Sequence, residues 1–244
     1  MQPNSHQYTS WYVHKLPVWM KAIRPLRPVA STIYAAITLH FRKKNAVTKV
    51  AGLRLKTMLD VGHPRFSPES KLLIRHLDTL PLQNKHVLDV GTGSGIIGVF
   101  AAKKGAKVLA VDVNPLAVQL ARENAILHGV EDKMQALEGD LFSKVLPVQR
   151  LDYIIINPVV CLSKLESFTQ SATNEVNNSD TIARFLEQAQ AFLAEKGKMI
   201  LIFNSEMPLC RIDKKIRQSG FIIASIKQSM HVFGFFYIFE LQVA

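Results

Sequence analysis

The stretch Val87–Ile97 constrains the fold more than any other part of this chain. It begins in an apolar segment, 86–90, that has the pattern of a buried strand, and it ends in a helix predicted over 96–104. Three glycines at alternate positions join the two segments. Because glycine has no Cβ, a ligand can lie directly against the backbone at the start of the helix. The stretch therefore predicts a strand, a ligand-binding turn and a helix in direct succession.

Strand patterns and helix patterns alternate after this turn. Ser67, just before Pro68, predicts the cap of an earlier helix that runs through Leu77, because a serine hydroxyl can accept an orphan backbone N–H. Further strands are expected over 107–112, 134–138, 153–157 and 199–203, and further helices over 115–128, 181–194 and 209–219. Such alternation implies a parallel sheet with helices on both faces.

The alternation stops near the C-terminus. Two β-rich stretches, 222–230 and 235–243, follow each other with only a short link, which permits only antiparallel pairing. The predicted fold class is therefore α/β, with a Rossmann-like, seven-stranded, mostly parallel sheet and a C-terminal antiparallel hairpin. A length of 244 residues with a hydrophobic fraction of 48% suits one such domain, placed at 60–244.

The first 59 residues have a different composition and are predicted to form a basic, aromatic, largely helical arm or lid. They carry ten of the basic residues and no acid, whereas the charges of the remaining chain almost balance. A helical stretch is expected at 30–41, and the loose alternation of 49–58 predicts a strand. The arm is acid-poor and rich in Trp and Tyr, so it differs from an ordinary catalytic domain.

Carboxylates follow the predicted strands where a cofactor would meet them. Asp112 closes the second strand and can accept both hydroxyls of a ribose. The segment 93–98 also satisfies the dinucleotide fingerprint, so NAD is the competing cofactor. Asp89, which can alternatively cap the neighbouring helix, suits the cationic amino-acid part of S-adenosylmethionine (SAM) better than an anionic pyrophosphate. A carboxylate beside an aromatic ring in 139–142 and the terminal hairpin also favour SAM.

The stretch from Phe66 to Val160 resembles the class I SAM-dependent methyltransferases, nearest to the methyltransferase small group, which includes release-factor glutamine and ribosomal RNA guanine-N2 methyltransferases. The resemblance implies a methyltransferase with SAM as cofactor, in which the glycines line the methionine moiety. It also implies that Asp112 holds the ribose, that Asp140 holds the adenine amine, and that Asn157-Pro158 faces the methyl group. The predicted cofactor-binding residues are Asp89, Gly91, Thr92, Gly93, Gly95, Asp112, Asn114, Asp140, Phe142 and Asn157, and the predicted catalytic residues are Asn157 and Pro158.

The motif at the end of the fourth strand departs from that of the resembling enzymes. They carry Asn-Pro-Pro-Tyr or Asn-Pro-Pro-Phe, whereas this chain has Asn157-Pro158-Val159-Val160. A valine lacks the π face of the missing ring, and stacking on such a face is worth roughly 1–3 kcal/mol per base in single-stranded recognition. We therefore expect methyl transfer to a nitrogen or oxygen of a small, apolar metabolite. Two alternatives stay open: methylation of RNA or of a protein glutamine, and SAM binding without catalysis.

Four roles compete for the arm. It can bind RNA through its basic and aromatic side chains, lie on an anionic membrane, close as a lid over a small acceptor, or serve as a targeting or solvated segment. The lid is favoured, with peripheral membrane contact as an addition and RNA as the next alternative. The polar loop 166–180 follows Asn157-Pro158 closely and is expected to contribute to the acceptor pocket.

Composition excludes several classes of protein. Cys161 and Cys210 are too few for a disulfide framework and lack metal-ligand spacing, so no metal site is predicted. The apolar run 30–41 is shorter than the roughly 20 residues that cross a bilayer, and the start lacks the features of a secretory signal. The expected location is cytoplasmic or peripheral at a membrane.

Overall fold

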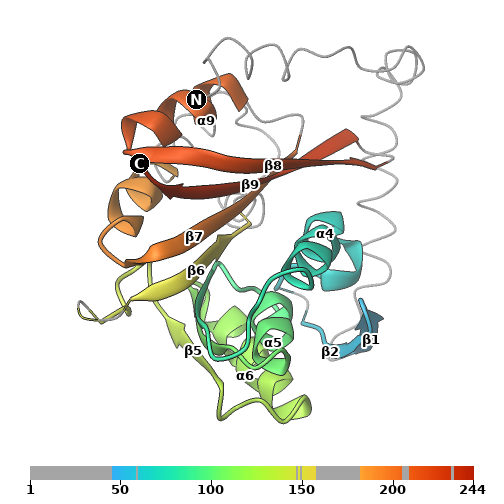
Figure 1. The fold of residues 1–244 in the computed structure, drawn as a ribbon. Helices are drawn as coiled ribbons and strands as arrows, with labels where there is room; N and C mark the ends of the chain where they lie inside the picture. The colour runs from blue at the N-terminus through green and yellow to red at the C-terminus, as the bar shows by residue number, and fades with distance from the viewer. Residues whose placement is uncertain are drawn as a thin grey trace.

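The computed structural model describes residues 46–58, 60–146, 148, 150–157, 182–204, 209–231 and 234–244. Within these ranges the chain forms a seven-stranded sheet in the order β5-β4-β3-β6-β7-β9-β8 and a separate two-stranded hairpin (Figure 1). The strands of the sheet are β3 (His86–Val90), β4 (Lys107–Asp112), β5 (Met134–Glu138), β6 (Leu151–Ile156), β7 (Leu193–Asn204), β8 (Phe221–His231) and β9 (Gly234–Val243). The neighbours from β5 to β7 are parallel, and β9 runs antiparallel to both β7 and β8. The predicted fold class, including the C-terminal hairpin, is confirmed.

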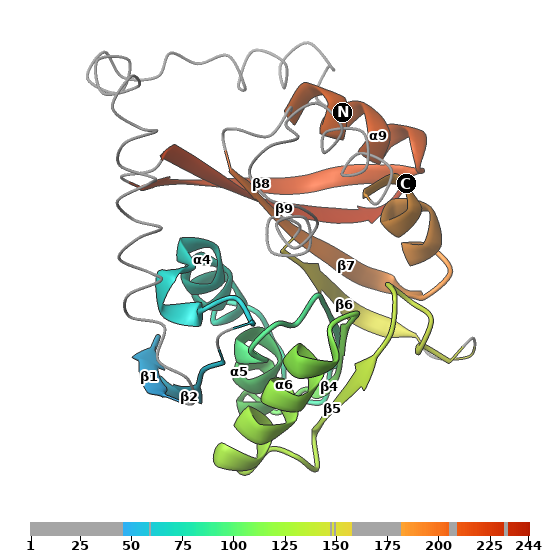
Figure 2. The same ribbon diagram turned by 180° about the vertical axis from the view of Figure 1, so that it is seen from behind.

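Helices cover both faces of this sheet (Figures 1 and 2). One core contains side chains of α4 (Pro68–Leu77), α5 (Ile96–Lys103) and α6 (Pro115–Leu127). The opposite core contains side chains of the helical residues 182–189 and of α9 (Leu209–Gln218). Successive strand residues alternate between the cores: Val87 packs in the first and Leu88 in the second. This two-sided burial explains why the central strands are apolar almost without interruption.

Two helix starts follow directly from local sequence. The Ser67 hydroxyl accepts a hydrogen bond from the Ser70 amide at 3.1 Å, and Pro68 occupies the first turn of α4. The Asn114 side chain accepts from the Leu116 amide at 3.0 Å and caps α6 in the same way, again with a proline in the first turn. These caps satisfy backbone donors that a helix start leaves without intrahelical partners. The predicted cap at Ser67 is confirmed.

The predicted helix 181–194 is wrong at its end, because β7 already begins at Leu193. Leu193 pairs with Leu151 and Lys198 with Tyr153, so the register of β6 and β7 shifts between these pairs. At Gly197 a Cβ would lie 2.7 Å from the Leu151 carbonyl oxygen. The irregular pairing needs a glycine at this close approach, and the tertiary contact with β6 overrides the helical pattern of the sequence.

The single strand predicted over 49–58 is also wrong. The structure has two short antiparallel strands, β1 (Val47–Val50) and β2 (Leu53–Lys56), joined by Ala51 and Gly52, both of which have positive φ. A two-residue turn with positive φ at both positions suits the right-handed twist of a hairpin. This hairpin lies within the predicted arm and packs against α6, whereas residues 1–45 lie outside the described residues.

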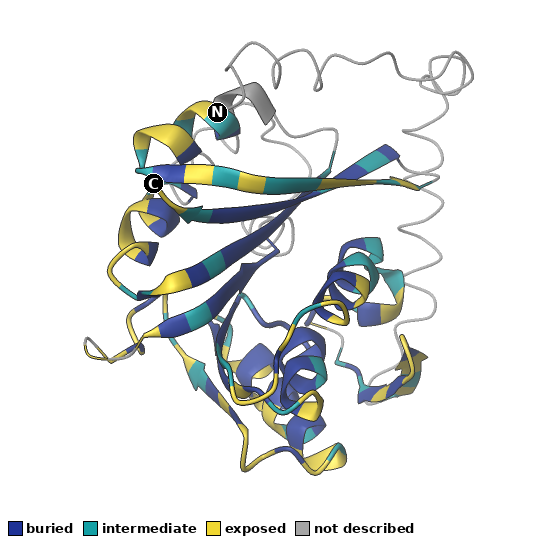
Figure 3. Ribbon diagram, in the orientation of Figure 1, coloured by how far each residue is buried: buried dark blue, intermediate teal, exposed yellow. Residues whose placement is uncertain are grey.

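Burial is uneven across the sheet. Figure 3 shows β6, β7 and β9 as largely buried, whereas β8 alternates between exposed and intermediate residues. This is the pattern of an edge strand with one partner. Among the described helices, none is long and apolar enough to span a bilayer.

A row of ionisable side chains connects α4 with the three C-terminal strands. His76 of α4 is buried, with its Nε2 3.0 Å from Glu240 Oε1 and its Nδ1 3.0 Å from Lys227 Nζ. Lys198 Nζ lies 2.7 Å from the other carboxylate oxygen of Glu240. Burial, and after it the charge of Lys227, lower the pKa of His76, although Glu240 opposes the shift. The imidazole is therefore held in its neutral form near pH 7.

We expect the pH dependence of stability to become shallower in a His76→Gln variant. Because the pKa of His76 is lower in the folded chain than in the unfolded chain, its contribution to stability is present above about pH 6.5 and is lost as the pH falls below that value. Denaturant titrations should show the free energy of unfolding of the wild type falling more steeply from about pH 8 to about pH 5 than that of the variant. Parallel pH profiles would contradict this assignment.

Candidate functional site

The predicted site residues gather at the carboxyl ends of neighbouring parallel strands. The glycine turn follows β3, Asp112 ends β4, Asp140 comes after β5 and Asn157 comes directly after β6. Strand β3 lies between β4 and β6, so the chain leaves it toward one side of the sheet and later returns on the other side. Open α/β sheets bind ligands in the crevice outside this point. The topology thus brings four sequence-distant segments to one edge.

The glycine turn has the left-handed backbone that its composition predicts. The φ angles of Gly91, Gly93 and Gly95 are 70°, 56° and 79°. A Cβ at Gly93 would have nothing within 4 Å among the described residues, whereas a Cβ at Gly95 would lie 2.9 Å from the Ala121 Cα on α6. Gly93 therefore leaves open space above the backbone, where a ligand can lie. Gly95 instead allows the turn to pack closely on α6.

Asp112 holds the turn from the neighbouring strand. Its Oδ2 accepts a hydrogen bond from the Gly93 amide and its Oδ1 accepts one from the Asn114 amide, each at 2.9 Å. The side chain is buried at the end of β4. Each carboxylate oxygen can accept more than one hydrogen bond, so the group can still receive ligand hydroxyls. Asn114 caps α6, and its Nδ2 lies 3.4 Å from the Asp60 carbonyl oxygen, which it reaches as a donor.

Asp89 has the capping role that its position left open as an alternative. Its Oδ2 accepts from the Thr92 hydroxyl at 2.6 Å and from the Gly98 amide, in the first turn of α5, at 3.1 Å. Burial raises the pKa of Asp89 to about 6, although these two hydrogen bonds work in the opposite direction. Asp89 and Thr92 thus stabilise the turn from within, and their predicted contact with the cofactor stays a prediction.

The two residues predicted to meet the adenine have separate surroundings. Asp140 is exposed, and one of its oxygens accepts a hydrogen bond at 2.6 Å from the exposed Arg184 guanidinium. The Phe142 ring is buried and stacks with Phe185, at 5.5 Å between centroids, and with Phe192, at 5.1 Å. Phe142 therefore packs in the core. Its role as an adenine wall stays a prediction, and the core position is the simpler explanation of its aromatic character.

Asn157 is the one predicted catalytic residue that the structure describes. It is 8% exposed, and neither its Oδ1 nor its Nδ2 has a hydrogen-bond partner among the described residues. Pro158, Val159, Val160, Cys161 and the loop 166–180 lie outside the described residues. A buried carboxamide without partners costs about 1–3 kcal/mol, so this group is well suited to bind a ligand.

Comparison with known protein families identifies the family to which a chain with these strand-end residues belongs. The methyltransferase small domain matches residues 61–225, which is more than half of the chain. The chain belongs to this family. It is therefore a SAM-dependent methyltransferase, as the resemblance in its sequence predicts, and its cofactor is SAM and not the rival NAD.

Individual relatives support this assignment. A Methanocaldococcus jannaschii protein, named as a candidate protein N5-glutamine methyltransferase, is 33% identical over 167 residues, which are 66% of this chain and 80% of that protein. The ribosomal protein L11 methyltransferase of Heliobacterium modesticaldum is 33% identical over 160 residues, which are 65% of this chain. The match spans only 44% of that relative's length.

Solved structures share the fold. The ribosomal protein L11 methylase of Lactobacillus delbrueckii subsp. bulgaricus superposes with a TM-score of 0.52 at 23% identity, over 71% of this chain and 76% of that one. A candidate methyltransferase called SMU.776, solved with the demethylated product SAH, gives a TM-score of 0.60 at 17% identity, over 81% of this chain and 56% of that one. At these identities the similarity is one of fold.

The residues of this methyltransferase fit SAM. The cofactor has a ribose with two hydroxyls, for which the fixed carboxylate of Asp112 lies at the correct strand end. Open space above Gly93 allows the backbone of the turn to approach a ligand closely. Asn157, whose side-chain amide has no partner among the described residues, follows Ile156, which pairs with Val90 just before the turn. In this arrangement Asp112 and the glycine turn would hold the cofactor, and Asn157 would face its reactive end.

Two polar residues near the carboxyl ends of these strands were not predicted from the sequence. Arg184, which pairs with Asp140, follows the long polar loop and carries no local signal of its role. Asn124 is fully buried on α6 and hydrogen-bonds the glycine turn. A signal for Asn124 was available, because an asparagine on the same helix face as Ala117, Ala121 and Ala125 is a polar residue among core positions.

Gly93 and Gly95, two of the three glycines of the turn, should respond differently to alanine. Gly95→Ala should cost about 3 kcal/mol or more of stability, because a left-handed backbone and a clash with Ala121 add together. Gly93→Ala should cost about 1–2 kcal/mol for its backbone alone, but it should weaken SAH binding about tenfold or more by filling the ligand space. Denaturant unfolding and calorimetry measure the two effects. Unchanged SAH affinity in Gly93→Ala would contradict the assignment of the open space above Gly93 to the ligand.

Proposed function

We propose that this methyltransferase transfers a methyl group from SAM to a nitrogen atom of a protein side chain. The observation that carries the proposal is the buried carboxamide of Asn157, whose Oδ1 and Nδ2 have no hydrogen-bond partners among the described residues. Asn157 comes directly after Ile156, which pairs with Val90 immediately before the glycine turn. Asn157 therefore follows β6 beside the glycine turn that we propose to hold the cofactor.

The methyl-transfer step requires mainly that the acceptor nitrogen and the methyl group are aligned. When bound, SAM supplies an electrophilic methyl group together with its leaving group, so the protein needs little chemistry of its own. The Oδ1 of Asn157 can accept a hydrogen bond from an acceptor N–H and so direct the nitrogen lone pair toward the methyl group. A carboxamide stays neutral across the working pH range, so this orientation would not depend on titration of Asn157.

The relatives favour a protein acceptor. The Methanocaldococcus jannaschii relative, of which the match covers 80%, is named for methylation of glutamine, and the Heliobacterium modesticaldum relative is named for methylation of a ribosomal protein. Both names specify proteins, and a glutamine side chain offers an N–H donor that suits Asn157. This support outweighs the small-metabolite prediction, which rests on the missing aromatic residue and on an arm that lies mostly outside the described residues.

The small, apolar acceptor remains the second candidate because one sequence observation favours it. Val159 and Val160 stand where the resembling enzymes carry proline and an aromatic ring. Two valines supply apolar area without a ring to stack on a planar amide or base. Apolar residues at these two positions of the sequence favour an acceptor with a compact apolar group beside the nitrogen.

Truncation of Asn157 should separate cofactor binding from catalysis. In Asn157→Ala we expect kcat to fall roughly 100-fold because the acceptor nitrogen loses its alignment, whereas the Kd for SAH changes by less than about fivefold. Steady-state kinetics and calorimetry give the two quantities. Gln135→Ala, which removes an exposed carboxamide from β5, is the matched control and should leave both unchanged. A variant with full kcat would remove Asn157 from the mechanism.

The acceptor class is tested with SAM that carries a radiolabelled methyl group. Wild type and Asn157→Ala are incubated separately with total protein, total RNA and the low-mass fraction of cells that lack this protein. The proposal predicts label in protein, recovered as an N-methylated amino acid after digestion, and much less label with the variant. Label confined to RNA or to low-mass compounds would contradict a protein acceptor.

A further inference from the structure

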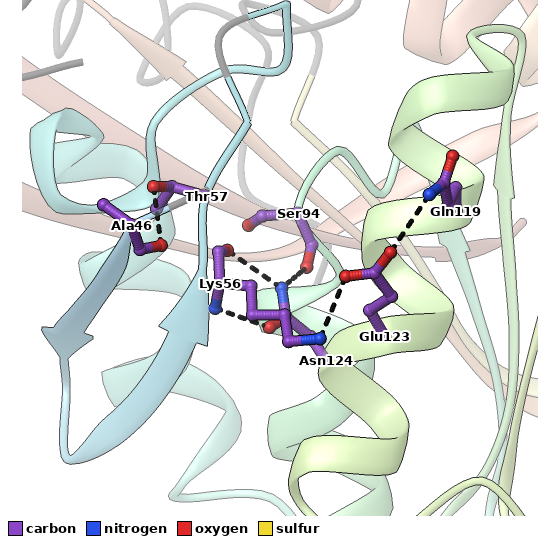
Figure 4. A network of polar contacts seen from close by, with 7 residues as sticks. All are labelled: Ala46, Lys56, Thr57, Ser94, Gln119, Glu123 and Asn124. Atoms are coloured by element: carbon purple, nitrogen blue, oxygen red, sulfur yellow. Dashed lines mark hydrogen bonds and ion pairs between the residues drawn. The ribbon is translucent and has the colours of Figure 1, made fainter. Parts of the chain in front are cut away.

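The N-terminal hairpin, β1 and β2, lies directly against α6 (Figure 4). Thr57 closes the hairpin, because its amide and its hydroxyl both donate to the Ala46 carbonyl, at 2.8 Å and 2.9 Å. Lys56 Nζ pairs with Glu123 on α6 at 3.1 Å, on the partly exposed side of the contact. The hairpin thus adjoins the helix that starts beside Asp112.

Asn124 forms the buried part of the same contact. Its side chain is completely buried on α6, and its Oδ1 accepts from the Lys56 amide at 2.7 Å. Its Nδ2 donates to two carbonyl oxygens, that of Lys56 at 3.2 Å and that of Ser94 at 2.8 Å. Both donors of the carboxamide are therefore used, one on the hairpin and one on the glycine turn (Figure 4).

Ser94 lies in the middle of the turn, between Gly93, which leaves the ligand space, and Gly95, which packs on Ala121. Ala121 and Asn124 are three residues apart on α6 and so lie on the same helix face. This face therefore holds the turn at two adjacent points, by a close contact and by a hydrogen bond.

We propose that Asn124 is a positioning residue that couples the hairpin to the glycine turn of the cofactor site. A buried carboxamide that joins two backbone segments couples their movements, because either segment can leave only by orphaning buried polar groups. A ligand that orders the glycine turn must then also order the hairpin, and by linkage an ordered hairpin strengthens binding of that ligand. The inference concerns the cofactor half of the site and stands whichever acceptor is correct.

The coupling is tested first in the wild-type protein by amide hydrogen exchange with and without SAH. Saturating SAH should slow exchange of the β2 amides, including that of Lys56, by about fivefold or more. If SAH protects the glycine turn but leaves the hairpin unchanged, the proposal is overturned. If SAH does not bind at all, it is the methyltransferase function that fails, so the two failures are distinguishable.

Variants then assign the coupling to Asn124. Asn124→Asp keeps the shape but replaces the two donors with an acceptor that faces two carbonyl oxygens, and Asn124→Ala serves if the first variant does not fold. In either variant, measured at a temperature where it is fully folded, the Kd for SAH should rise about tenfold and protection of the hairpin by SAH should disappear. Tight binding with hairpin protection intact would contradict the role of Asn124.

Two controls separate positioning from general destabilisation. Glu123→Gln weakens the partly exposed ion pair between the same hairpin and the same helix without touching Ser94. Leu241→Ala removes a fully buried side chain from β9 and lowers stability far along the sheet from the turn. Both controls should keep the SAH affinity and the hairpin protection of the wild type. If Leu241→Ala lost as much SAH affinity as the Asn124 variants, lost stability alone would explain their weaker binding. That result would contradict the proposed role of Asn124.

Discussion

The hold of β4 on the glycine turn is the interaction on which the rest of the site depends. The Val111 carbonyl accepts from the amides of Gly91 and Thr92, and the Asp112 carboxylate accepts from the amide of Gly93. Three consecutive amides of a turn with left-handed glycines are thereby fixed by the end of one neighbouring strand. A turn of this kind would otherwise be among the most mobile parts of a protein, because glycine restricts its backbone least. The hydrogen bonds from β4 therefore order a turn whose own glycines would leave its backbone flexible.

Other contacts extend this order around the turn. Asp89 fixes it from β3 by capping α5, and Asn124 fixes it from α6 while also binding the hairpin. Each of these polar groups is buried, so each hydrogen bond is difficult to replace by water. The opposite case is Asn157, whose buried carboxamide has no partner among the described residues. The buried groups that have partners hold the glycine turn, whereas the carboxamide of Asn157 can still accept hydrogen bonds from a ligand and donate hydrogen bonds to it.

The sequence predicts the sheet well where local patterns and tertiary contacts agree. The strands at 86–90, 107–112 and 134–138 begin and end as predicted, because each lies between clear helix or turn signals. The pattern fails at Leu193, where pairing with Leu151 extends β7 into a predicted helix. It also fails at Ala51 and Gly52, whose positive φ angles turn one predicted strand into a hairpin.

The strand-end positions of the candidate site residues were predictable from the sequence, but the contacts that each residue makes were not. The spacing of the glycines cannot tell that Gly95 packs on Ala121 while Gly93 faces open space, since this depends on where α6 lies. Likewise, the burial of Phe142 depends on Phe185 and Phe192, which are distant in sequence. The coupling through Asn124 joins residues 30 and 68 positions away, beyond the reach of any local pattern.

The most direct test of this account is calorimetric titration of SAM, SAH and NAD into the wild type, Asp112→Ala and the exposed control Asp132→Ala. The account predicts that SAM and SAH bind to the wild type and the control whereas NAD does not. It also predicts that Asp112→Ala weakens SAH binding about 10-fold to 100-fold, because the variant loses charge-assisted hydrogen bonds and releases the Gly93 amide. Binding of NAD, failure of both SAM and SAH to bind, or wild-type affinity in Asp112→Ala would contradict the assigned cofactor site.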